Sequence, residues 1–217
     1  DLGLCKPGPL ADFVRRFIDP EVRFGDLNRE LVVIATDLIT GNPVVFSNNT
    51  TPETRVFDAV VSSCSVPGIF PARRCGNWIL SDGMISTPLP LQWADWTRKV
   101  IAVSLIGLHE HANWPMEKKK VAQNKIGARL PFSKRNSSVV TEGNGSSATG
   151  AVDVALRSMA VIAKAQIRSV LRDYPNTVLL EPKVGNMSFI GFNQIDEYYT
   201  AGVASAEKYL AHLHAGR

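Results

Sequence analysis

The sequence predicts an α/β fold with a mostly parallel central sheet flanked by helices. Two segments of the 217-residue chain, Leu31 to Thr36 and Val100 to Ile106, are short and almost continuously apolar, as is typical of strands covered on both faces. Segments with helical periodicity follow each of them. The composition, 45% hydrophobic and 20% charged residues, is ordinary for one globular domain with a sizeable core.

The first predicted helix follows the Leu31 to Thr36 strand. Thr51 is suited to cap it and Pro52 to occupy its first position. Apolar residues then recur on one face: Val56, Phe57, Val60, Val61 and Cys64. Prolines at positions 67 and 71 end the helix, and a short strand, Trp78 to Leu80, is expected to lead into an Asp82-Gly83 turn.

In the C-terminal part, the spacing of apolar residues predicts a long helix over Ala151 to Arg172, a strand over Thr177 to Leu180 and a last helix over Ile195 to His212. Between these elements and Ile106 lies an insert, about residues 109–150, which is basic and then rich in Ser, Gly, Asn and Thr. We expect a flexible loop there. It could act as a lid or as a patch that meets anionic lipid, at about 1 kcal/mol per cation, or simply be solvated. Its cations are Lys118, Lys119, Lys120, Lys125, Arg129, Lys134 and Arg135.

Three segments carry a resemblance to a known family: LVVIATDLITG from Leu31, SSCSVPGIFP from Ser62 and LSDGMISTPLP from Leu80. Together they resemble the second half of a patatin-like phospholipase domain. The resemblance implies hydrolysis of phospholipids, lysophospholipids or other lipid acyl esters by a Ser-Asp dyad, with no metal or organic cofactor. It also implies that residues 1–217 are the C-terminal part of one such domain, interrupted by the insert at about 109–150.

Asp82 is the candidate catalytic residue that the resemblance implies, as the aspartate of the dyad. It follows a strand, where a carboxylate can act as a general base towards a serine hydroxyl. The alternative interpretation is an ordinary Asp-Gly surface turn. Met84 departs from the Gly or Ala that usually follows the Asp-Gly pair in the family.

The nucleophile of the dyad has no clear counterpart in the sequence. In the family, a Gly-x-Ser-x-Gly elbow and a Gly-rich oxyanion loop both precede the segment with which this chain begins, so we expect the domain to be incomplete at its N-terminus. The nearest match to the elbow is Gly145-Ser146-Ser147-Ala148-Thr149, with Thr149 in place of the second glycine. Its preceding strand could only be Ser138 to Thr141, which is short and half polar. A flexible loop is the interpretation we prefer for Ser147.

Other polar residues favour structural roles. Asp37 is expected to cap the turn at Thr40-Gly41. The pairs His109/His111 and His212/His214 lie in a loop and a tail and lack a third ligand for zinc. Cys5, Cys64 and Cys75 have no metal-ligand spacing and are expected to be reduced, buried thiols, with a Cys64 to Cys75 disulfide as the alternative.

The net charge of +4 and a pI near 9.1 suit an anionic partner. Peripheral contact with a lipid surface fits this charge, whereas nucleic acid is disfavoured because aromatic residues do not alternate with the basic run. A noncatalytic lipid-binding or protein-binding relative of the same fold is the alternative function. Because strands such as Leu31 to Thr36 would lack neighbours without upstream strands, we also expect an upstream fragment or a homo-oligomer.

Overall fold

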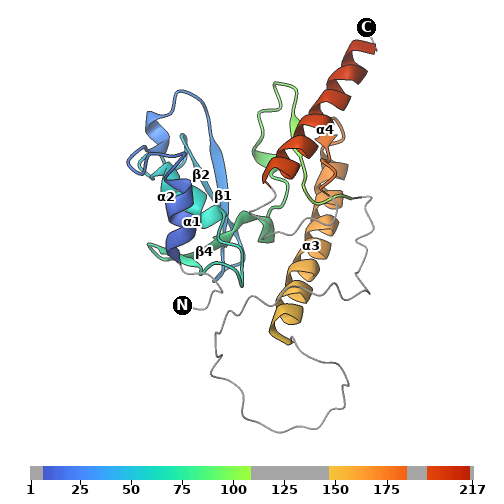
Figure 1. Ribbon diagram of the computed structural model, residues 1–217. Helices are drawn as coiled ribbons and strands as arrows, with labels where there is room; N and C mark the ends of the chain where they lie inside the picture. The colour runs from blue at the N-terminus through green and yellow to red at the C-terminus, as the bar shows by residue number, and fades with distance from the viewer. Residues whose placement is uncertain (1–6, 109–146, 185–194, 216–217) are drawn as a thin grey trace.

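The computed structural model describes residues 7–108, 147–184 and 195–215, which form a mixed α/β structure (Figure 1). Its larger sheet has four strands in the order β2-β1-β4-β3. The strands are β1 (Val32–Asp37), β2 (Pro43–Ser47), β3 (Arg73–Cys75) and β4 (Trp78–Asp82). All three pairings in this sheet are antiparallel.

The prediction of a mostly parallel sheet is therefore wrong for the larger sheet. Residues 38–42 alone connect β1 to β2, and Gly76 and Asn77 alone connect β3 to β4. A parallel connection needs a crossover of a dozen or more residues, so these short links can only form antiparallel hairpins. Gly76, with φ +54, takes a left-handed conformation that suits the tighter of the two hairpins.

Helix α2 (Val56–Ser63) contacts both β1 and β4, and helix α1 (Pro7–Val14) packs on α2. The core between α2 and the sheet contains fully buried side chains such as Phe24, Phe46 and Leu80. A second small cluster joins α1 to α2 through Val14, Phe57 and Val61. The helical face expected from the sequence is thus confirmed, except that Cys64 follows the helix and is exposed.

Helix α2 begins at Val56, later than expected, with Arg55 as its N-cap. The preceding residues are held in another conformation, because the amide of Phe24 donates to the carbonyl of Thr54 and the amide of Val56 donates to that of Val22. Thr51, the predicted cap, instead accepts a hydrogen bond from the Ser47 amide at 3.0 Å. Long-range pairing of the backbone has overridden the local capping signal.

The C-terminal part contains β5 (Ile101–Val103), α3 (Ser147–Asp173), β6 (Val178–Leu180) and α4 (Ile195–Ala215). Strands β5 and β6 form a separate parallel pair. The long chain segment between them, which includes α3, gives the crossover that parallel strands require. Figure 1 shows α3 beside the larger sheet and α4 extending away towards the C-terminus.

The two parts meet along α3. Leu156 packs with Ile69 and Phe70 of the loop after α2, and Ile167 packs with Leu89 and other residues near β5. Short 3-10 helices occupy Phe24–Asp26, Gly83–Ile85 (η2) and Leu91–Trp93. The loop over 83–91 therefore links the larger sheet to α3.

The pairing of β1 and the burial of β5 both differ from the expectation. β1 is an inner strand paired on both edges, so the predicted loss of its neighbours does not occur. Val100 to Ile106 was expected to be covered on both faces, but only Ala102 and Ser104 are buried. Ile101, Val103 and Leu105 alternate with them and are 50–58% exposed. This face of β5 is open among the described residues.

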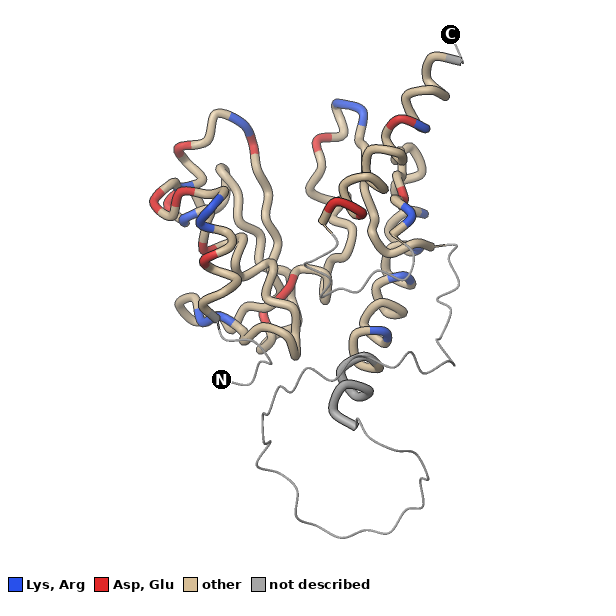
Figure 2. Tube along the Cα trace, in the orientation of Figure 1, with Lys and Arg blue, Asp and Glu red and all other residues tan. Residues whose placement is uncertain are grey.

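Basic and acidic positions are interspersed along the described parts of the chain, as Figure 2 shows. The basic insert lies mostly outside these parts, so its predicted contact with lipid stays a prediction. None of the helices in the described ranges is long and apolar enough to cross a bilayer.

Candidate functional site

Asp82 is the last residue of β4 and caps η2. Its amide donates to the Ser65 carbonyl at 3.0 Å, and its own carbonyl accepts a hydrogen bond from the Thr36 hydroxyl at 2.8 Å. One carboxylate oxygen, Oδ1, accepts from the Met84 amide at 2.8 Å. Oδ2 accepts no hydrogen bond from the residues that the structure describes. The amide and the carbonyl of Asp82 are thus both held by hydrogen bonds, while Oδ2 of its carboxylate can still accept one.

Gly83 explains why a glycine follows the aspartate. A Cβ added at this position would lie 2.2 Å from the carbonyl oxygen of Ile34 in β1. The glycine is needed for close backbone approach, and not for a left-handed conformation, because its φ is not positive. Gly83 is buried and Asp82 is half-buried, so the pair lies at the junction between β4 and β1, with Asp82 capping the turn that follows.

The electrostatics of Asp82 suit a proton acceptor. Burial raises the pKa of its carboxyl above the ordinary value, although the hydrogen bond from the Met84 amide offsets part of this effect. Cys64, which the sequence analysis did not connect with Asp82, lies near enough to respond to its charge. Partial burial and then the Asp82 carboxylate raise the pKa of the Cys64 thiol, although the residue keeps exposed surface.

The serines of the SSCSVPGIFP segment hold this junction together. Ser63 donates to the Ile34 carbonyl at 2.6 Å, and Ser65 donates to the Val61 carbonyl at 2.7 Å. In β4, Ser81 donates to the Ser65 carbonyl at 2.7 Å. Because each hydroxyl proton serves a backbone carbonyl, none of these serines is directed at the Asp82 carboxylate. Among the described residues, no serine or threonine hydroxyl donates to it.

Ser147 is the first residue of α3. The predicted strand before it, Ser138 to Thr141, lies outside the described residues, and so does most of the insert. The structure therefore gives no geometry between this serine and Asp82. The assignment of Ser147 to a loop and not to an elbow stays a prediction.

Asp37 plays the structural role that its position predicted. Its carboxylate accepts from the Thr40 hydroxyl at 2.8 Å and also from the amides of Ile39, Thr40 and Ile79. Burial alone would raise the pKa of Asp37, but these hydrogen bonds outweigh it and lower the pKa. This carboxylate is fully engaged in joining the β1–β2 turn to β4.

Several smaller predictions can be compared with the structure. Cys64 and Cys75 are free thiols, so the alternative disulfide between them is wrong, as is the expected burial of Cys64. Cys5, His109 and His111 lie outside the described residues. His212 and His214 fall in the last turn of α4. No group of three or more potential metal ligands occurs within the described ranges.

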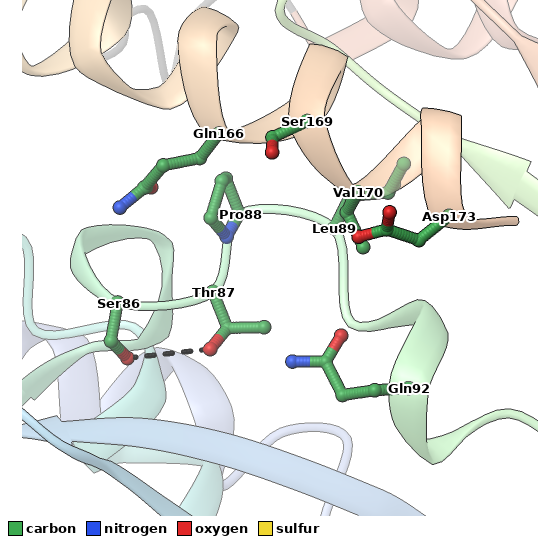
Figure 3. A pocket seen from close by; sticks show the side chains of 9 residues that line it. All are labelled: Ser86, Thr87, Pro88, Leu89, Gln92, Gln166, Ser169, Val170 and Asp173. Atoms are coloured by element: carbon green, nitrogen blue, oxygen red, sulfur yellow. Dashed lines mark hydrogen bonds between the residues drawn. The ribbon is translucent and has the colours of Figure 1, made fainter.

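A cleft of about 240 Å³ lies between the loop over 86–92 and the C-terminal half of α3 (Figure 3). Ser86 lies at its edge nearest η2 and is 2.8 Å from the Thr36 hydroxyl, oxygen to oxygen. Because Thr36 donates its proton to the Asp82 carbonyl, Ser86 must be the donor between them. Two hydroxyl groups thus join the cleft to the backbone carbonyl of Asp82, and not to its carboxylate. Only the tertiary structure brings α3 to this loop.

A comparison with known protein families finds a match in the N-terminal part of the chain. A family model described as patatin-like phospholipase matches residues 1–95. The matched range contains the larger sheet, the serine-rich segment and Asp82, and it ends before β5. Residues 1–95 are therefore similar to a patatin-like phospholipase, a similarity that supports lipid acyl hydrolysis in general terms.

Proposed function

We propose that this protein hydrolyses acyl esters of lipids, of the phospholipase A or lysophospholipase type, with Asp82 as the general base of a Ser-Asp dyad. A serine oxygen would attack the ester carbonyl while Asp82 takes the serine proton, and Asp82 would pass that proton to the leaving alcohol as the ester bond breaks and an acyl-enzyme forms. Asp82 would then take a proton from water as the water attacks the acyl-enzyme, and would return it to the serine oxygen as the fatty acid leaves. This sequence offers no serine in the family's motif, so the dyad needs a serine from elsewhere.

The observation that carries this proposal is the environment of Asp82 inside the range that matches the family. The carboxylate is partly buried, has a raised pKa and keeps Oδ2 without a hydrogen bond among the described residues. A base whose pKa is raised towards the working pH accepts a proton more readily than an ordinary aspartate. The fully bonded Asp37, only one strand away, lacks these properties.

The test is hydrolysis of a lysophospholipid by the natural full-length protein and its Asp82→Asn variant. We expect the substitution to lower kcat by about 100-fold to 10,000-fold, the usual contribution of a general base. Asp95→Asn changes an exposed carboxylate outside the site and should leave kcat unaltered. Activity of Asp82→Asn within about threefold of the parent would overturn the proposal.

The 217-residue chain alone is expected to be inactive towards a short-chain nitrophenyl ester, since its near-match serine is not assigned to an elbow. Turnover by this chain that disappears in Ser147→Ala would contradict both the expected inactivity and our interpretation of Ser147. Turnover that survives Ser147→Ala would require another nucleophile, and Cys64→Ala would then test the thiol beside Asp82.

A noncatalytic lipid-surface or protein-binding relative is the second candidate. It is favoured by one observation: the hydroxyls of the serine-rich segment near Asp82 are all used for structure. This candidate requires a natural gene without an elbow serine and vesicle binding that Asp82→Asn leaves unaltered. An elbow and a Gly-rich loop in the same reading frame would favour the enzyme.

A further inference from the structure

The cleft beside α3 has no role in the chemistry proposed above. Figure 3 draws the side chains that line it, which come from two distant chain segments. Six polar residues line it, three from the loop and three from α3: Ser86, Thr87, Gln92, Gln166, Ser169 and Asp173. Pro88, Leu89 and Val170 add apolar surface. The volume of about 240 Å³ is below the roughly 300 to 1,000 Å³ of drug-sized sites, so the cleft suits a small ligand.

Two side chains in the lining have acceptor oxygens without partners. The Gln166 amide donates through Nε2 to the Ile85 carbonyl at 3.4 Å, whereas its Oε1 is buried and has no hydrogen-bond partner in the described structure. Asp173 is solvent-exposed and makes no hydrogen bond or ion pair with the residues described. A buried acceptor without a partner is costly, so a ligand that donates a hydrogen bond to Gln166 Oε1 would remove that cost.

The one charge within the lining is negative, while the Arg172 guanidinium touches the lining from outside at Ser169. Asp173 is the only ionisable residue among the nine that line the cleft. It is also the last residue of the 27-residue helix α3, where the free carbonyl groups carry partial negative charge. The Arg172 guanidinium donates to Ser169 Oγ at 3.4 Å, which leaves the hydroxyl proton of Ser169 free to meet an acceptor on a ligand.

We propose that this cleft binds a small ammonium group carried on a short hydroxylated or esterified chain, that is, an amino alcohol such as ethanolamine. The ammonium would pair with Asp173, and the alcohol oxygen would accept a hydrogen bond from Ser169. Gln166 Oε1 would supply a second acceptor after rotation of its amide. The amino alcohol could be free in solution or belong to a lipid head group. The head-group source rests on the proposed lipid hydrolysis, whereas binding of the amine does not.

The link between Ser86 and Asp82 gives this binding site a position relevant to the proposed reaction. Ser86 donates to Thr36, which donates to the Asp82 carbonyl. A head group held in the cleft would lie at the far end of this short chain of hydroxyls. The cleft would then select which lipid presents its ester to Asp82, while taking no part in the chemical step.

The test is an NMR titration of the natural full-length protein with three compounds of nearly equal size: ethanolamine, ethylene glycol and glycolate. They differ in charge, being cationic, neutral and anionic at pH 7. We expect ethanolamine to cause saturable shifts at Ser86, Ser169 and Asp173, with an affinity at least about tenfold higher than that of the other two. Shifts without saturation, or equal affinity for ethylene glycol or glycolate, would overturn the proposal.

Two variants and one control assign the binding to this cleft. Asp173→Asn should lower the affinity for ethanolamine at least about tenfold, and Gln166→Leu about threefold to tenfold. Glu207→Gln removes an exposed carboxylate of α4 and should have no effect. An unchanged affinity in Asp173→Asn would refute the site. Asp82→Asn should bind ethanolamine normally, so this result is separate from the fate of the proposed hydrolysis.

Glycerophosphoethanolamine distinguishes the two sources of the amine. This water-soluble compound carries the phosphate and glycerol of a lipid without its acyl chains. Affinity within about threefold of ethanolamine supports a lipid head group, since the phosphate is tolerated. Affinity lower by about tenfold or more supports a free amino alcohol, because the phosphate then meets the Asp173 carboxylate.

Discussion

Gly83, the first residue of η2, lies against the backbone of β1 directly after the proposed general base. Its buried position leaves no room for a side chain, because the Ile34 carbonyl would be 2.2 Å from a Cβ. Ser63 donates to the same carbonyl at 2.6 Å. The position of Asp82 thus depends on a glycine and a serine hydroxyl that themselves do no chemistry.

Gly83→Ala is expected to destabilise the protein by about 3 kcal/mol or more, since the clash is with backbone and no side chain can move to relieve it. Urea unfolding measures the change. Gly202→Ala is the matched control: Gly202 lies within α4 with nothing within 4 Å of an added Cβ. That variant should be stabilised by about 0.5 to 1 kcal/mol. A fully stable Gly83→Ala protein would contradict this account of the junction.

Asp82 is expected to reduce stability at neutral pH. Because its pKa in the folded state is raised above 3.8, the folded state holds the proton more tightly than the unfolded state does. Stability therefore falls as the pH rises from about 3.8 through the raised pKa. Asp82→Asn should be more stable than the parent at pH 7, and this gain should vanish below about pH 3.8.

Urea unfolding at several pH values tests that effect. Asp95→Asn is a control with the opposite sign, because hydrogen bonds from the Thr97 hydroxyl and amide lower the pKa of Asp95. It should lose stability at pH 7 and not at low pH. An Asp82→Asn variant that is less stable at pH 7 would show that the carboxylate stabilises the fold.

At the scale of elements, local patterns were reliable where an element is long. Helices α3 and α4 and the strands β1, β4, β5 and β6 lie close to their predicted ranges. β2 was not predicted, and β3 lies in a segment that was expected to be a loop. The Gly76-Asn77 pair between Cys75 and Trp78 was the signal for a hairpin.

Helix α3 depends on Ile167, which is 1% exposed and packs with Leu89, Leu91 and Leu108. Ile167→Ala should cost about 2 to 5 kcal/mol, the usual effect of such a truncation in a core. Ile162→Ala, on the same helix and 58% exposed, should change the free energy of unfolding by no more than about 0.5 kcal/mol. Equal losses in both variants would mean that Ile162 is covered in solution.

At the scale of the whole molecule, the open face of β5 is the least expected feature. Parallel strands are normally covered on both faces, and two strands alone are marginally stable. Here Ile101, Val103 and Leu105 are exposed among the described residues. An upstream fragment or a second copy of the chain remains the prediction, and this face offers such a partner apolar surface.

Val103→Thr tests whether this face is free in solution, because it keeps the shape of the side chain and adds a hydroxyl. If Val103 is exposed, the free energy of unfolding should change by no more than about 0.5 kcal/mol. Val61→Thr, at a position 1% exposed, should cost about 1 to 3 kcal/mol. A loss above about 1 kcal/mol in Val103→Thr would indicate that another segment or subunit covers β5.

The sequence by itself determined the long helices, most strands, the capping role of Asp37 and the family resemblance that singles out Asp82. These depend on periodicity, turn chemistry and short motifs, which act over a few residues. Only the tertiary structure decided the antiparallel order of the larger sheet, the close contact of Gly83 with Ile34 and the cleft between residues 86–92 and α3. Each of these joins segments far apart in the chain, where packing and backbone pairing outweigh local preference.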